Sequence, residues 1–174
     1  MTHCDLDFAL EKQLRTIFYS MMTLSANLIA LLIYTFAAIY FGRQFGRHQS
    51  LPVHQLRQVA AVALIIHGVG VYGLSMKDGQ LAFSLFSISS LIFWVVNAIV
   101  LISGLRKELH NLFLLLFPLS AVSVLGSILG DNPDWQHKLE YTIATHVISS
   151  ILAYSLLTIS ILQALLLAYQ NRAL

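Results

Sequence analysis

Charged residues are scarce in this sequence, because Lys, Arg, Asp and Glu together make up only 10% of its 174 residues. An ordinary soluble domain carries about 25% charged residues, and so few charges cannot cover a water-soluble globule of this size. Hydrophobic residues reach 57% and the mean hydropathy is +0.76. The composition therefore indicates a protein whose surface faces lipid.

Cysteine is also nearly missing, and its single occurrence, Cys4, excludes an intramolecular disulfide and a CxxC thiol pair. The net charge of +2 and the lack of a basic stripe with interleaved aromatics exclude a nucleic-acid partner. The chain holds no HExxH, GxSxG or phosphate-loop motif and no ExxH carboxylate pair. We therefore expect no catalytic activity of its own.

Long apolar runs are what the sequence has in abundance. A membrane-spanning helix needs about 20 mostly apolar residues, and five segments reach or approach that length. We predict an all-α, polytopic membrane bundle with five transmembrane helices, at about residues 17–41, 59–76, 81–105, 112–130 and 143–169. The membrane domain then covers residues 17–174 and follows an extracytoplasmic leader, residues 1–16, whose acidic residues are not typical of a cleavable signal peptide.

The charges of the short connections predict the orientation. Lys and Arg mark cytoplasmic loops, and the basic residues lie on alternate connections: Arg43, Arg47, Arg57, Arg106, Lys107 and Arg172. The connection before the fifth segment is instead acidic, with Asp131, Asp134 and Glu140 against Lys138. This pattern predicts an inner-membrane protein with a periplasmic N-terminus and a cytoplasmic C-terminus.

Small residues recur within the apolar segments. Lipid gives helices no hydrophobic reason to associate, so small and polar side chains mark their contacts. Such stripes occur in the second to fifth segments: Gly68, Gly70 and Gly73; Ser84, Ser87, Ser89 and Ser90; Ser120, Ser123, Gly126 and Ser127; Ser149, Ser150, Ala153, Ser160 and Ala164. We interpret them as packing seams, with a serine-lined ligand cavity as the alternative.

Two histidines lie within the apolar segments, His67 and His146. A polar group inside a membrane is costly and indicates a functional site, although a neutral His bonded to a neighbouring helix is the structural alternative for His67. An interfacial helix-start residue is the corresponding alternative for His146. At 1.5 Å per residue the two differ in depth by roughly 8 Å, which argues against both binding one heme iron.

A family resemblance adds to this picture. The sequence around His146 reads Asp134-Trp135-Gln136-His137 and then Thr145-His146 through Ala153-Tyr154 to Leu157. This resembles the cytochrome c assembly family of CcsA-type and HemX-like membrane proteins, and among them the short YpjD-type members. The stretches from His67 to Val69 and from Leu85 to Trp94 also resemble earlier helices of that family. The likeness covers about residues 55 to 170.

The resemblance implies a helical bundle that handles heme at the outer face of the membrane. It assigns His146 as an axial heme ligand. His67 and Trp135 are further candidate heme contacts, with anchoring at the membrane interface as the alternative for Trp135. The family's tryptophan-rich heme motif is missing, because only Trp94 and Trp135 occur. Relatives also continue into further helices that carry a second outer histidine. We therefore expect a truncated version of the family that binds heme weakly or not at all alone.

Three functions follow from these observations. The first is a non-catalytic, heme-handling component of cytochrome c assembly, which meets other assembly subunits or a C-terminal helical portion in trans. The second is a cofactor-free membrane scaffold or accessory subunit that acts through helix contacts. The third, a transporter-like protein, has neither a broken helix nor a buried carboxylate in its favour.

Overall fold

The computed structural model describes residues 3–47, 52–77, 80–104, 110–130, 137–138 and 141–172. Within these ranges the chain forms a bundle of long helices: α1 (His3–Gly46), α2 (Val53–Ser75), α3 (Leu85–Ser103), α4 (Phe113–Gly130) and α5 (Tyr141–Arg172). All five of these described helices are long and apolar enough to cross a membrane. The predicted all-α bundle is confirmed, and by length and composition the chain is a multi-pass membrane protein.

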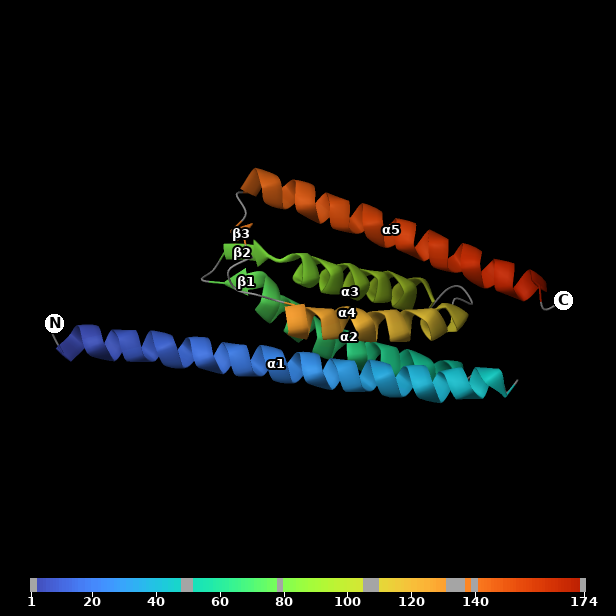
Figure 1. Ribbon diagram of the computed structural model, residues 1–174, viewed down its shortest axis with the longest axis horizontal. Coiled ribbons are helices and arrows are strands. Elements are labelled where there is room, and N and C mark those ends of the chain that lie inside the picture. Colours follow the sequence, from blue (N-terminus) through green and yellow to red (C-terminus); the bar gives the residue numbers. More distant parts are fainter. Residues whose placement is uncertain are drawn as a thin grey trace.

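The helices do not contribute equally to the bundle. Helix α1 packs on α2 and α4, whereas α3 packs on α2, α4 and α5. In Figure 1 α1 and α5 lie on opposite sides, with the other three helices between them. The span Thr142–Tyr169 of α5 is 22% buried, against 39% for the α4 span Phe113–Gly130. Helix α5 is thus the peripheral helix, attached chiefly through α3.

Three short strands close one end of the bundle: β1 (Met76–Lys77), β2 (Gln80–Phe83) and β3 (His137–Lys138). They pair antiparallel in the order β1-β2-β3, with Met76 opposite Leu81 and Phe83 opposite His137. The pairing joins the connection after α2 to the connection before α5, and both lie at the end of the bundle where α1 begins (Figure 1).

Helix α3 begins at Leu85 rather than at residue 81, because its start is determined by a cap. Ser84 adopts an extended conformation, and its hydroxyl accepts a hydrogen bond from the backbone N–H of Ser87. The Ser87 hydroxyl in turn accepts from the Ser84 backbone N–H at 2.8 Å. This reciprocal capping box satisfies two N–H groups at the helix start, and the apolar residues before it form β2 instead.

Helices α1 and α5 extend past both ends of the apolar runs that predicted them, and α2 extends past the start of its run. Helix α1 begins at His3, so residue 17 is not a helix start and the described leader residues continue the same helix. At 1.5 Å per residue, α1 is about 66 Å long, well beyond the roughly 30 Å of bilayer hydrocarbon. Its N-terminal end projects past the other helices (Figure 1), where Arg15 pairs with Glu11 one turn away at 3.1 Å. Hydropathy detects only the part of a helix that suits lipid.

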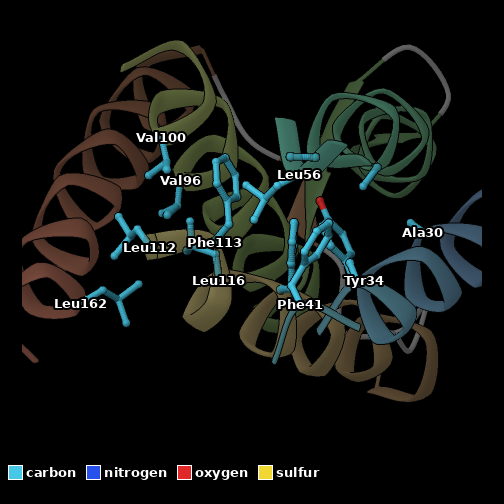
Figure 2. Packing of buried hydrophobic residues seen from close by; sticks show 14 of the residues in the cluster. Ala30, Tyr34, Phe41, Leu56, Val96, Val100, Leu112, Phe113, Leu116 and Leu162 are labelled. Carbon is cyan, nitrogen blue, oxygen red and sulfur yellow. The ribbon is translucent and has the colours of Figure 1, made fainter. Parts of the chain in front are cut away.

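Aromatic side chains fill the centre between α1 and α4. The ring of Phe117 lies 5.5 Å from that of Phe113 and 6.1 Å from those of Tyr34 and Phe41. Figure 2 shows Tyr34, Phe41 and Phe113 directed into the same interior with Leu56 and Leu116. The core therefore joins α1, α2 and α4 toward the end of the bundle where α1 ends and α2 and α4 begin.

Candidate functional site

The first candidate histidine, His67, is fully buried at the meeting point of three helices. Its Nδ1 lies 3.2 Å from the hydroxyl of Tyr34 on α1, and its Nε2 lies 2.9 Å from the hydroxyl of Ser90 on α3. The Tyr34 ring stands almost perpendicular to the imidazole, with centroids 5.6 Å apart. A neutral imidazole donates at one nitrogen and accepts at the other, so each hydroxyl has the partner it needs.

This geometry indicates that His67 has a structural role. Both ring nitrogens are engaged by protein hydroxyls, so neither is free to bind a metal. In the described part of the chain, no group of three or more His, Cys, Asp or Glu side chains is placed to hold a metal ion. The structural alternative for His67 is the one that the contacts favour, and the residue joins α1, α2 and α3.

A second contact joins α2 to α3 next to this histidine. The indole Nε1 of Trp94 donates to the backbone carbonyl of Leu64 at 2.9 Å. Its ring reaches α2 at Gly68, where an added Cβ would lie 2.9 Å from Nε1. The polar edge of Trp94 is therefore used inside the bundle. The indole can lie this close to α2 only because Gly68 has no side chain.

Helices α3 and α4 meet through a polar seam. Asn97 donates from Nδ2 to the Ser120 hydroxyl at 2.7 Å, and the hydroxyls of Ser89 and Ser123 lie 3.3 Å apart. Hydrogen bonds between helices are worth about 1 kcal/mol each in membranes. The predicted seam on α4 is confirmed, since Ser120, Ser123 and Ser127 are all buried.

Helices α1 and α2 meet through glycine. A Cβ at Gly70 would lie 2.0 Å from Oδ1 of Asn27, and a Cβ at Gly73 would lie 1.9 Å from Oγ1 of Thr23. Both α1 side chains are buried. The Thr23 hydroxyl donates to the Tyr19 carbonyl at 2.8 Å, so it is satisfied within its own helix. The two glycines let these polar side chains enter the surface of α2.

The seam predicted on α5 is wrong. Its serines satisfy their hydroxyls within the helix: Ser149 and Ser150 donate to the His146 carbonyl, and Ser160 donates to the Leu156 carbonyl. Such bonds let a serine face lipid without a partner helix. Ser149, Ala153, Ser160 and Ala164 are all exposed. The buried face consists instead of Ala144, Ile151, Ser155, Ile159 and Leu162.

The second candidate histidine, His146, is exposed in the second turn of α5. Its backbone carbonyl accepts the two serine hydroxyls, whereas its imidazole forms no side-chain bond within the described residues. The structure thus does not bring His146 and His67 together, since one imidazole faces outward and the other is enclosed between Tyr34 and Ser90. Trp135 lies outside the described residues.

Of the two histidines considered as heme ligands, only His146 has an imidazole that is not engaged by other described side chains. His146 can offer one axial nitrogen, because a neutral imidazole binds a metal through a free ring nitrogen. His67 cannot offer the second, because hydroxyl groups engage both of its ring nitrogens. A heme bound to His146 would therefore need a second ligand other than His67.

Sequence reasoning did not single out three polar residues of the interior, Tyr34, Asn27 and Asn97. Each lies in the middle of an apolar run, which by itself indicates a buried contact.

Comparison with known proteins adds nothing to this geometry, because no protein family, curated protein or solved structure matches the chain.

Proposed function

We propose that this protein is a non-catalytic, heme-handling membrane component of the cytochrome c assembly type, which works with a partner in trans. The observation that carries the proposal is the position of His146. Its imidazole is exposed near the start of α5, the helix with the least buried span, and makes no side-chain bond within the described residues. An incoming partner can reach both the imidazole and the uncovered faces of α5.

The division of roles between the two histidines supports this proposal. His67 is bound to two helices and stabilises the bundle, whereas His146 lies where packing makes no use of its ring. Heme, when bound, would supply an iron that accepts one imidazole nitrogen. The partner would provide the second ligand and exclude water from the porphyrin.

The proposed orientation places the start of α5 outside the inner membrane and its end in the cytoplasm. The C-terminal ends of α1, α3 and α5 lie at the same end of the bundle (Figure 1). Arg43, Arg47 and Arg57 lie at this end as well. The positive-inside rule makes this the cytoplasmic end.

Reporter proteins fused after Leu174 test this orientation. A phosphatase that is active only in the periplasm should be inactive there, and a fluorescent protein that folds in the cytoplasm should be bright. Phosphatase activity with a dark fluorescent fusion would contradict the orientation.

The His146→Ala variant tests the heme proposal. We expect the full chain, purified in detergent together with its copurifying cytochrome c assembly subunits, to carry a Soret band that this variant lacks. External imidazole should restore part of the absorbance by occupying the vacated position. The matched control is His54→Ala, which removes another exposed histidine from the opposite end of the bundle. A Soret band that survives His146→Ala but disappears in His67→Ala would contradict the assignment.

A cofactor-free accessory subunit is the second candidate, and the packing of the interior favours it. Hydrogen bonds between side chains hold neighbouring helices together, as those of His67 with Tyr34 and of Asn97 with Ser120 do. If partner proteins copurify equally with the wild type and His146→Ala and neither preparation shows a Soret band, this function replaces the first.

A further inference from the structure

A groove of about 620 Å³ runs between α1 and α2 on the surface of the bundle. Its floor is buried, with Ala37 and Phe41 at 4% and 2% exposure, while Phe36 and Tyr40 form an open wall at 73% and 56%. The volume lies within the range of sites that hold small ligands. The groove is thus a surface channel lined almost wholly by carbon.

The length of the groove matches part of one bilayer leaflet. Along α1 it extends from Leu32 to Phe41, which at 1.5 Å per residue is about 14 Å. One leaflet contributes about half of the roughly 30 Å hydrocarbon thickness. Tyr40 stands at the end nearest the helix terminus, and tyrosine favours the membrane–water interface. A single lipid chain aligned with α1 fits this geometry.

The polar end of the groove carries positive charge and hydrogen-bond donors. Arg43 follows Tyr40 by three residues on α1, and Arg47 lies in the turn directly after the helix; both are exposed. Gln55 and Gln58 line the groove from α2. The sequence contains no Asp or Glu between residues 12 and 77, so no carboxylate of this segment neutralises the arginines.

We propose that this groove is a binding site for an anionic phospholipid of the bilayer, with one acyl chain between α1 and α2. The phosphate contacts Arg43 and Arg47, and the amides of Gln55 and Gln58 donate to headgroup oxygens. An acyl chain in the groove only replaces its contacts with other lipid chains, so the apolar walls give little selectivity. Selectivity comes from the headgroup, because basic side chains near the surface attract anionic lipids.

Lipid binding to the full chain in detergent tests the site, with phosphatidylglycerol and phosphatidylcholine of identical chains as probes in native mass spectrometry. We expect phosphatidylglycerol to be retained preferentially. Arg43→Gln and Arg47→Gln should each weaken its binding about fivefold. The matched control is Arg15→Gln, which removes one arginine from the far end of the same helix and should leave binding unchanged.

A second variant tests the groove without touching the charges. Val59 lines the groove, whereas Val62, one turn along α2, does not line it and is 50% exposed. Val59→Trp should fill the channel and lower phosphatidylglycerol retention, and Val62→Trp should not. Equal retention of both lipids by the wild type would overturn the proposal. Full retention of phosphatidylglycerol by Val59→Trp would also overturn it. A third such result would be that the wild type binds an added neutral isoprenoid quinone and that Val59→Trp loses the quinone but keeps phosphatidylglycerol.

Discussion

Replacing His67 with alanine should lower the free energy of unfolding of the detergent-solubilised protein by about 3 kcal/mol. The substitution leaves a cavity between three helices and deprives the Tyr34 and Ser90 hydroxyls of their partner. Tyr34→Phe and Ser90→Ala remove one hydrogen bond each and keep most of the volume, so each should cost only about 1 kcal/mol. Unfolding in increasing mole fractions of SDS, followed by tryptophan fluorescence, measures all three variants.

The exposed histidine provides the matched control for this series. His146→Ala removes the same side chain from a position without buried contacts, so its unfolding curve should overlay that of the wild type. The two variants would then separate the effect of a histidine on stability from its effect on ligand binding. An unfolding curve for His67→Ala that also overlays the wild type would show that the three-helix contact does not hold the bundle together.

The fold could be predicted because lipid imposes one strong constraint on sequence. Each apolar run long enough to cross the hydrocarbon is a helix in the structure, since backbone groups in lipid must bond within their own segment. The ends could not be predicted in the same way. The helical hydrogen bonds of α1 continue from residue 17 back to His3, and the start of α3 depends on the Ser84 cap, neither of which hydropathy detects.

The interior contacts were predictable only where a polar residue or a glycine interrupts the apolar pattern. His67 was identified as a candidate for that reason, but its partners Tyr34 and Ser90 come from other helices whose rotation the sequence does not reveal. On α5 nearly every residue is apolar or small, so its buried face could not be distinguished from its lipid face. A serine there does not by itself indicate packing, because Ser149 and Ser155 both donate to a carbonyl of their own helix, yet Ser155 is buried and Ser149 is exposed.

The contact between α1 and α2 depends on the absence of a side chain at Gly70. A Cβ at this position would lie 2.0 Å from Oδ1 and 2.7 Å from Cγ of Asn27. Both distances are far below van der Waals contact, and Asn27 is 2% exposed with buried surroundings. The added methyl group must therefore displace the Asn27 side chain or separate the two helices.

Gly70→Ala should accordingly lower the free energy of unfolding by about 2 kcal/mol, the usual cost of overpacking. Asn27→Ala in the same chain should restore most of this loss, because it removes the atoms that the new methyl group meets. The matched control is Gly42→Ala on α1, where a Cβ would meet nothing within 4 Å; it should be neutral or slightly stabilising, since alanine is the better helix former. SDS unfolding of Gly70→Ala, Asn27→Ala and the double variant forms a double-mutant cycle with the wild type, and Gly42→Ala is its control. If Gly70→Ala and the double variant lose the same free energy of unfolding, a clash with Asn27 does not cause the loss. Gly70 would then be required by another contact.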